Sequence, residues 1–280
     1  MKSRNLLYPS FKNLFSLKGK NAIVTGGVGI LGKYFCAGLA ECGANVIVLD
    51  LDEKKTAAFS DELERTYKVR TFGLACDVTS PVKIRKAMAQ ILEKFQEIHI
   101  LHNNAGGKSG NLDAYFESFE KYSYEEWKTV SAINIDGMFL MAQAVGKHMI
   151  EHGKGGSIIQ TSSIYGIMAP DQRIYEGSRY LDRPINTPAV YSATKAAVIG
   201  LTKYLSTYWS GRGIRVNSIT PGGVESGQNE TFKRRYSSRI PLGRMAFAHE
   251  MVGALIYLAS DASSYVTGHN LVVDGGLSAW

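Results

Sequence analysis

The sequence predicts an α/β fold in which one doubly wound, mostly parallel sheet of seven strands carries helices on both faces. Three observations lead to this prediction. Apolar runs alternate with segments of helical periodicity along the whole chain of 280 residues. The runs are apolar throughout, as in strands that are covered on both sides. No repeat, low-complexity tract or linker divides the chain, so we expect a single domain.

These runs and segments define the order of the elements. Strands are expected at residues 21–25, 45–50, 70–76, 98–102, 157–162, 215–220 and 271–273. Helices are expected at residues 31–41, 54–67, 81–95, 124–151, 189–209 and 249–260. Gly43 follows the first helix, where a left-handed cap is favoured. Ser123 and Glu126 predict a capping box at the start of the helix at 124–151.

Two long stretches lack periodicity. Residues 169–188 contain three prolines and three arginines, and residues 222–248 are polar and basic. Both follow the carboxyl end of a strand, the edge at which doubly wound sheets bind ligands. Long irregular loops in a compact domain are commonly functional. We therefore expect an inserted loop at 169–188 and a substrate loop at 222–248 within a domain at 18–280, preceded by a basic extension at 1–17.

The net charge of +7 arises from basic residues before Glu41 and again at 233–244. No nucleic-acid-binding module accompanies them, so we expect no nucleic-acid partner. A solvated basic surface that attracts a small anionic substrate is the simpler interpretation.

The chain has no run approaching the ~18 apolar residues of a membrane helix, and no membrane association is expected. Its basic N-terminus lacks the apolar core of a secretion signal, and a simple extension is favoured over a transit-like leader. Three cysteines have neither metal nor redox spacing, which predicts a cytoplasmic protein without a metal site: Cys36, Cys42 and Cys76.

A glycine-rich turn follows the first strand. It precedes an amphipathic segment, which is the context in which glycines and a helix N-terminus cradle a dinucleotide pyrophosphate in a Rossmann-like fold. Glycines there let the phosphates approach the backbone. The alternative is a glycine-rich turn without a ligand. The cofactor-binding residues expected here are Gly26, Gly27, Gly29, Ile30, Leu31 and Gly32.

Asp50 ends the second strand, eighteen residues beyond Gly32. A carboxylate at this position suits the ribose diol of the adenosine. It would repel a 2′-phosphate, and neither Val28 nor Leu51 offers a cation. NAD is therefore expected in preference to NADP. The alternative role for Asp50 is that of a helix cap.

Tyr191 and Lys195 lie four residues apart on one face of a predicted helix. A free phenol titrates near ~10, so proton transfer near neutrality needs roughly 4 kcal/mol of stabilisation of its ionised form. A lysine ammonium one turn away is a plausible source. Together with the glycine turn, this pair predicts hydride chemistry on a nicotinamide cofactor. The alternative for Tyr191 is an aromatic residue that only packs at a helix start.

Over residues 18–276 the chain resembles the short-chain dehydrogenase/reductases of the compact type. The matching motifs are the glycine turn, Cys76-Asp77-Val78, Asn103-Asn104-Ala105-Gly106, Asn134, Ser162-Ser163, Tyr191 with Lys195, and Pro221-Gly222-Gly223. One departure is at the turn, where the compact pattern has glycine at position 30 and this chain has Ile30 after Gly29.

The resemblance implies a role for each matching residue. Tyr191 would be the acid/base, Lys195 would depress its pKa and hold the nicotinamide ribose, and Ser163 would orient the reacting carbonyl or alcohol. Asn134 would hold a proton-relay water. The remaining cofactor contacts implied are Asp77, Val78, Asn104, Ala105, Gly106, Pro221, Gly222, Val224 and Ser226.

Ser163 and Tyr191 are 28 positions apart, farther than the family's usual spacing, so the residues between them must loop out beside the substrate. The sequence from Ser162 through Gly177 resembles the flagellin modification protein A group, which are oxidoreductases of bacterial surface-sugar pathways. This resemblance implies a polyhydroxylated, possibly anionic substrate in surface-glycan synthesis of the nonulosonate type. Expected substrate contacts are Ser163, Tyr165, Arg173, Gln228 and Asn229, with Arg179, Arg183, Arg234, Arg235 and Arg239 as further anion-binding candidates.

Two other functions remain open. A catabolic sugar-acid oxidoreductase, similar to fructuronate reductase or gluconate 5-dehydrogenase, would use the same motifs. A cofactor-binding sensor or scaffold without catalysis is opposed by the intact set of Asn134, Ser163, Tyr191 and Lys195. A homotetramer, or at least a homodimer, is expected because the helices at 124–151 and 189–209 are apolar over more than one face. Burial against the sheet alone is the alternative.

Overall fold

The computed structural model describes residues 13–280 and contains the predicted seven-stranded sheet. The strand order is β3-β2-β1-β4-β5-β8-β9, and every neighbouring pair is parallel. The strands are β1 Asn21–Thr25, β2 Asn45–Asp50, β3 Thr71–Ala75, β4 Ile100–Asn103, β5 Gly156–Thr161, β8 Ile214–Pro221 and β9 Asn270–Val273. The prediction of one doubly wound domain is confirmed, and the sheet is parallel throughout.

The strand order reverses at β1: β2 and β3 lie on one side of it, and β4 and the later strands lie on the other. Ile23 of β1 is paired with Ile47 of β2 on one side and with Leu101 of β4 on the other. The loops that follow β1 and β4 therefore leave the same edge of the sheet side by side. This is the position at which doubly wound sheets bind ligands, and the glycine turn begins here.

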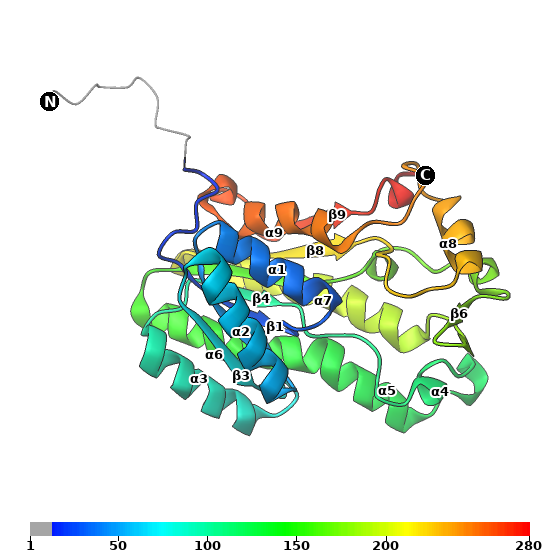
Figure 1. Ribbon diagram of the computed structural model, residues 1–280, viewed down its shortest axis with the longest axis horizontal. Helices are drawn as coiled ribbons and strands as arrows, with labels where there is room; N and C mark the ends of the chain where they lie inside the picture. Colours follow the sequence, from blue (N-terminus) through cyan, green and yellow to red (C-terminus); the bar gives the residue numbers. More distant parts are fainter. Residues whose placement is uncertain (1–12) are drawn as a thin grey trace, which may run out of the picture.

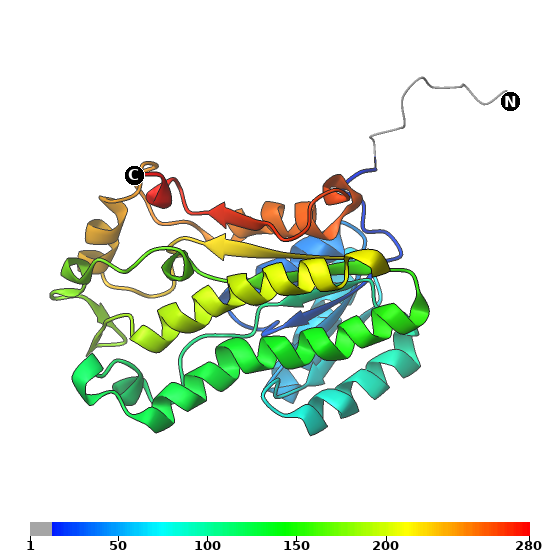
Figure 2. The same cartoon turned by 180° about the vertical axis from the view of Figure 1, so that it is seen from behind.

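Helices cover both faces of the sheet (Figures 1 and 2). One face carries α1 Ile30–Glu41, α2 Glu53–Tyr67 and α9 Val252–Ala259, and the other carries α3 Pro81–Phe95, α6 Gly137–His152 and α7 Ala189–Tyr208. Successive strand residues point to opposite faces. Ile47 therefore packs in the core beneath the second set of helices, whereas Val48 packs beneath the first.

Several helix ends follow from the local sequence. The Asp52 carboxylate accepts the N–H of Lys55 at 3.0 Å at the start of α2. The Ser123 hydroxyl accepts the N–H of Glu126 at 3.1 Å, which provides one half of the predicted capping box. Each cap satisfies an N–H group that a helix start leaves without a partner. Gly43 has φ of +92° just beyond α1, as expected for a left-handed cap.

The predicted helix at 124–151 is interrupted. It consists of α5 Tyr124–Ser131, a π-helical turn at Ala132–Asp136, and α6. A Cβ at Gly137 would lie 2.7 Å from a methyl group of Val78, so glycine permits close packing where α6 begins. Single π turns within helices are frequent at functional sites, and this one contains Asn134.

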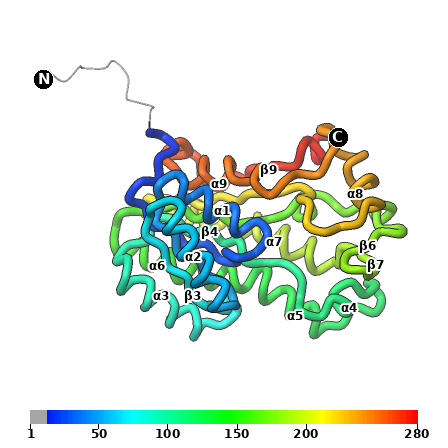
Figure 3. The backbone as a smooth tube through the Cα atoms, viewed as in Figure 1, coloured from blue at the N-terminus to red at the C-terminus, as the bar shows by residue number. Residues whose placement is uncertain are grey.

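The two stretches without periodicity contain short elements that the sequence analysis did not predict. Residues 169–188 include the antiparallel hairpin of β6 Arg179–Tyr180 and β7 Arg183–Pro184, and the substrate loop includes α8 Glu230–Ser237. A short helix, α4 Leu112–Tyr115, follows β4. Figure 3 shows these elements together at one end of the molecule. They are too short to produce a periodic signal in the sequence.

Part of the predicted extension packs against the domain. Leu17 is buried, and the N–H of Ala262 donates to the carbonyl oxygen of Leu14 at 3.1 Å. The rest of the extension, residues 1–12, lies outside the described residues. Within residues 13–280, no helix has the length and apolar character needed to cross a membrane.

Candidate active site

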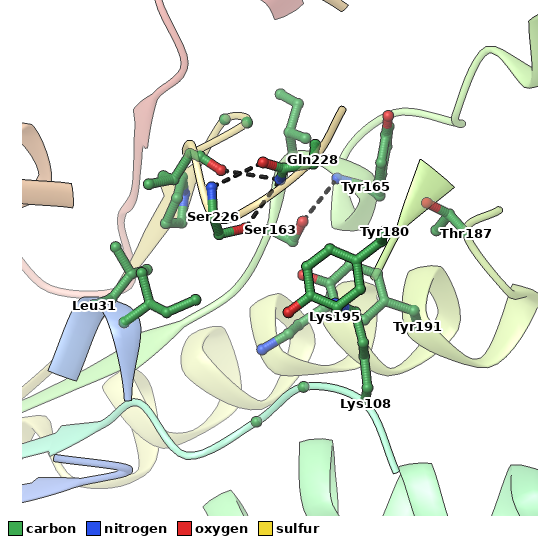
Figure 4. A pocket seen from close by; sticks show the side chains of 18 of the residues that line it. Leu31, Lys108, Ser163, Tyr165, Tyr180, Thr187, Tyr191, Lys195, Ser226 and Gln228 are labelled. Carbon is green, nitrogen blue, oxygen red and sulfur yellow. Dashed lines mark hydrogen bonds between the residues drawn. The ribbon is translucent and has the colours of Figure 1, made fainter. Parts of the chain in front are cut away.

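A cavity of about 430 Å³ opens at the carboxyl edge of the sheet (Figure 4). This volume falls in the range of sites that bind small organic ligands. The structure brings many of the predicted residues together in its lining: Gly26, Gly29, Ile30, Leu31, Asn104, Gly106, Ser163, Tyr165, Tyr191, Lys195, Pro221, Gly222, Val224, Ser226 and Gln228. The other predicted residues lie behind the lining or away from it: Gly27, Gly32, Asp50, Asp77, Val78, Ala105, Asn134, Arg173 and Asn229.

The glycine turn has the geometry of a phosphate cradle. Gly26 has φ of +64°, and a Cβ there would lie 3.0 Å from Cα of Ala105. A Cβ at Gly32 would lie 2.0 Å from the carbonyl oxygen of Gly26, so only glycine lets α1 pack against the turn. No side chain caps the N-terminus of α1, and its first turn contains no acid. The free N–H groups and the helix dipole suit an anion, and these residues fit a dinucleotide pyrophosphate.

Ile30 occupies the position at which the compact family pattern has glycine. It is the first residue of α1, and its side chain is exposed at the cavity. Gly29 has φ of −71° and Ile30 is helical, so neither position requires the left-handed backbone that favours glycine. The departure from the family pattern is therefore accommodated without backbone strain.

Asp50 lies beside the glycine turn. Its Oδ2 accepts the N–H of Val28 at 3.1 Å, and its Oδ1 accepts the N–H of Leu51 at 2.8 Å. It is not the cap of α2, because Asp52 has that role. The half-buried carboxylate is thus held at the end of β2 by two backbone donors, next to the turn.

Residues after β3 and β4 complete the cofactor side of the site. Thr25 Oγ1 accepts the N–H groups of Asn104 and Ala105 at 3.0 and 2.9 Å, which joins the end of β1 to the end of β4. Asp77 Oδ1 accepts the hydroxyl of Thr79 at 2.7 Å, and this bond is the main reason that the pKa of Asp77 is lowered. The Asp77 carboxylate is thereby kept ionised at the same sheet edge.

Ser163, Tyr191 and Lys195 form the centre of the cavity wall. Lys195 is buried, and its Nζ donates to the carbonyl oxygen of Thr161 at 2.9 Å. The hydroxyl of Ser162 donates to the carbonyl oxygen of Lys195 at 2.7 Å, so both ends of the lysine are attached to the β5 end. Helix α7 presents Tyr191 one turn before Lys195, with Nζ 5.9 Å from the centroid of the phenol ring.

The protein's own groups affect the proton affinities of this pair in different ways. Burial lowers the pKa of Lys195 to about 8. Burial raises the pKa of Tyr191, and its side-chain hydrogen bond with Ser163 lowers it. The expected lowering of the Tyr191 pKa by Lys195 is not among these effects. Of these two effects, that of Ser163 is the one that favours ionisation of the phenol.

Asn134 lies behind the lining and is fully buried. Its Oδ1 accepts the N–H of Gly107 at 2.8 Å, and its Nδ2 lies 3.4 Å from Thr194 Oγ1 on α7. A Cβ at Gly106 would lie 3.1 Å from both Asn134 Oδ1 and Lys195 Nζ. Gly106, which has no side chain, therefore lies between the Asn134 amide and the Lys195 ammonium group. The π turn places Asn134 beside Gly106.

Hydroxyl groups line the side of the cavity formed by the inserted loop. Tyr175 hydrogen-bonds to Thr187 Oγ1 at 2.5 Å and donates to the hydroxyl of Tyr165 at 3.4 Å. Burial is the main reason that the pKa values of Tyr165 and Tyr175 are raised, so both keep their protons. Neutral hydroxyls can both donate and accept hydrogen bonds. The predicted position of Tyr165 in the site agrees with this arrangement.

The substrate loop contributes Gln228, whose amide is partly engaged within the loop. Gln228 Oε1 accepts the N–H of Ser226 at 2.8 Å, and its Nε2 donates to Ser226 Oγ at 3.0 Å. Asn229 differs from the expectation. It caps α8 through the N–H of Phe232, donates to the carbonyl oxygen of Gly177, and does not line the cavity.

None of the six arginines proposed as anion-binding groups lines the cavity, which corrects the expectation for Arg173. The physical reason is that acids and a carbonyl oxygen outside the cavity hold five of them. Their partners are Asp171 for Arg173 and Arg239, Asp113 for Arg183, Glu176 for Arg235, and the carbonyl oxygen of Asp182 for Arg179. The sixth, Arg234, is an exposed residue of α8.

About half of the lining consists of residues that were not predicted from the sequence as site residues. The additional residues are Gly107, Lys108, Tyr115, Phe116, Thr161, Ser162, Ile164, Tyr175, Tyr180, Ile185, Asn186, Thr187, Gly223, Phe232, Tyr236 and Met245. Lys108 could have been found, because it directly continues the motif that ends at Gly106. Most of the others come from segments without periodicity, where no local signal shows which side chains face the cavity. Among the described residues, no group of His, Cys, Asp or Glu side chains is placed to hold a metal.

Comparisons with known proteins agree with this site. A sequence model described as enoyl-(acyl carrier protein) reductase matches residues 29–278. D-threitol dehydrogenase from Mycolicibacterium smegmatis is 35% identical over 267 residues, covering 94% of each chain. The chain belongs to the short-chain dehydrogenase/reductase family, and it is an oxidoreductase of that family.

Solved structures show the same fold. A short-chain type dehydrogenase/reductase from Mycobacterium marinum has a TM-score of 0.84 and 32% identity, covering 97% of this chain and 100% of that one. A gluconate 5-dehydrogenase from Burkholderia cenocepacia in complex with NADP and tartrate has a TM-score of 0.83 and 33% identity, covering 96% and 98% of the two chains. The predicted family is thus confirmed, while the particular subgroup is not decided by these relatives.

Proposed function

We propose that the protein is an NAD-dependent dehydrogenase that interconverts a hydroxyl and a keto group of a small, polyhydroxylated, sugar-like substrate. The observation that carries this proposal is the shared lining of one cavity. Ser163, Tyr191 and Lys195 lie in it together with the glycine turn and a wall of tyrosine and threonine hydroxyls. The reaction type is inferred from Ser163, Tyr191, Lys195 and the glycine turn. The substrate class is inferred from the tyrosine and threonine hydroxyls.

In the proposed reaction, Tyr191, Ser163 and Lys195 each have a separate role. A bound nicotinamide would supply or accept the hydride. Tyr191 transfers the proton at its phenol oxygen to or from the substrate oxygen. Ser163, which lines the cavity with that phenol, orients the same substrate oxygen. Lys195 provides positive charge one helical turn away, and Thr161 and Ser162 hold it in position.

The proposed preference for NAD rests on Asp50. Its carboxylate lies at the end of β2, where the adenosine ribose is bound in this fold. A ribose diol can donate to a carboxylate, whereas a 2′-phosphate would be repelled by it. The relative from Burkholderia cenocepacia binds NADP, so the preference has to be measured for this chain.

The substrate class is supported by two observations. Several protonated hydroxyls and the amide of Gln228 line the cavity, and such groups suit a ligand with many hydroxyls. Relatives of this chain are named for threitol and gluconate. The same cavity has to hold the nicotinamide and the substrate, which favours a substrate as small as these.

The biological setting has two candidates. Surface-glycan synthesis of the flagellin-modification type is supported by the resemblance of residues 162–177 and by the inserted loop beside the site. Catabolism of polyols or sugar acids is supported by the names of the relatives. A sensor without catalysis has no observation in its favour. The three cysteines, which form no disulfide among the described residues, support the proposed cytoplasmic location.

The test is a turnover assay that follows reduced cofactor. The purified protein is incubated with NAD⁺ or NADP⁺ and a panel of neutral polyols, sugar acids and nucleotide sugars. Turnover of a polyol or sugar acid with NAD⁺ supports the proposal, and turnover restricted to nucleotide sugars favours the biosynthetic setting. Tight NADH binding without turnover on any of the panel would reject the enzyme function in favour of the sensor.

A further inference from the structure

The cavity wall contains a lysine that the proposed mechanism does not use. Lys108 follows β4, two residues after Gly106, and lines the same cavity as Tyr191. Its Nζ lies 3.5 Å from the centroid of the Tyr180 ring and 5.7 Å from that of Phe116. Figure 4 shows the Lys108 side chain directed toward Tyr180, on the side of the cavity where Tyr191 lies.

The charged side chains in the described part of this lining are all positive. Among residues 13–280, Lys108 and Lys195 are the charged residues of the lining, and no Asp or Glu lines the cavity. The Lys195 ammonium donates to Thr161 and is buried. Lys108 is exposed and belongs to none of the ion pairs among residues 13–280. Within the described part of the chain, the cavity therefore presents one accessible positive charge to a ligand, that of Lys108.

Two further properties of Lys108 suit an anion. Its contact with the face of Tyr180 is a cation–π interaction, which fixes the position of the ammonium group without neutralising it. Partial burial by surrounding protein atoms lowers the pKa of Lys108, as is usual for an ammonium group without a carboxylate partner. A bound anion would supply that partner, and the group's three N–H donors could bond to it.

We infer that Lys108 recognises a carboxylate on the substrate, so that the enzyme prefers a sugar acid to the corresponding neutral polyol. This inference rests on the proposed function, because it assigns the substrate's charge within the same site. It replaces the six arginines as the source of anion specificity. Tyr180 of the inserted hairpin has the supporting role of holding the ammonium group, which gives the insertion a part in substrate selection.

The experiment compares two four-carbon probes of the same configuration, threitol and threonate, which differ in one terminal group. Binding of each to the full-length protein saturated with NADH is measured by calorimetry. Threonate should bind the unmodified protein roughly tenfold or more tightly than threitol, the size expected of one charge-assisted hydrogen bond. In Lys108→Met the ratio of the two affinities should fall to near one, and Lys108→Arg should retain most of the preference.

The matched control is Lys128→Met, because Lys128 also lies over a tyrosine, with Nζ 4.6 Å from the ring centroid of Tyr124, but outside the cavity. It should leave the ratio unchanged. The inference is overturned if the unmodified protein shows no preference, if the preference survives in Lys108→Met, or if that variant loses both probes equally. Turnover of neutral polyols without any anion preference contradicts the role of Lys108 alone. Absence of binding and of turnover for all polyols and sugar acids contradicts the proposed function as well.

Discussion

The ammonium group of Lys195 donates a 2.9 Å hydrogen bond to the carbonyl oxygen of Thr161, which ties helix α7 to the end of β5. The neighbouring Ser162 hydroxyl donates to the carbonyl oxygen of Lys195 at 2.7 Å. The position of the lysine is therefore set by the sheet as well as by its helix. Burial of the positively charged Lys195 side chain lowers the free energy of unfolding. This effect can be measured because it depends on pH.

Lys195→Met should remove a pH-dependent cost of folding. Burial lowers the pKa of Lys195 from 10.5 to about 8 in the folded protein. Below pH 8 both states bind the proton and the full cost is present. As pH rises from 8 to 10.5, the folded protein loses the proton first, the unfolded chain binds more protons, and stability rises. The free energy of unfolding of the unmodified protein, relative to Lys195→Met, should thus increase on the order of 2–3 kcal/mol over this range.

The measurement is denaturant unfolding of both proteins at several pH values between these limits. Lys203→Met, which alters an exposed lysine on the same helix, is the control. A difference between the unmodified protein and Lys195→Met that is constant with pH would contradict the effect of burial on Lys195.

Tyr191→Phe should abolish turnover while leaving cofactor affinity nearly unchanged. The substitution removes only the hydroxyl that transfers the proton, and the ring still packs at the start of α7. Turnover is followed by reduced cofactor, and NADH affinity by fluorescence titration. Tyr204→Phe, on the exposed part of the same helix, should behave like the unmodified protein. Near-normal turnover of Tyr191→Phe would refute the proposed mechanism.

Asp50→Ala should reduce the preference for NADH over NADPH. Loss of the carboxylate removes a charge-assisted bond to the ribose, so NADH affinity should fall by ~1–3 kcal/mol, while NADPH affinity should rise or stay unchanged because the repulsion of the 2′-phosphate is removed. Asp52→Ala is the control, since that acid caps α2 and pairs with Lys55, and both cofactor affinities should stay unchanged. Tighter binding of NADPH than of NADH by the unmodified protein would disprove the proposed preference.

The protein should form a homotetramer, or at least a homodimer, through α6 and α7, which Figure 2 shows running side by side. Phe139 of α6 is 45% exposed, and Tyr204 and Tyr208 of α7 are 61% and 66% exposed. Large apolar side chains gathered on adjoining helices favour association. Tyr208→Glu should shift the mass measured by light scattering at micromolar concentration toward smaller species. Tyr34→Glu, on α1 across the sheet, should not. A monomeric unmodified protein would contradict this prediction.

The sequence by itself determined the features that depend on residues close together in the chain. The apolar runs predicted all seven strands because fully covered strands need uninterrupted apolar residues. The glycine turn and the spacing of Tyr191 and Lys195 were equally visible, since each lies within one turn or one strand–helix junction. These local patterns define the fold and are the basis of the proposed cofactor side of the site and the proposed pair of reacting residues.

Only the tertiary structure decided which distant side chains share the cavity. The π turn with Asn134 lies directly before Gly137, which packs closely against Val78. Arginines that were expected in the site form ion pairs outside it with partners such as Asp171 and Asp113. Lys108 meets Tyr180 across 72 residues of sequence, because the inserted hairpin folds back over the loop after β4. Such contacts follow from how the loops pack together in space, and a single sequence carries no periodic signal for them.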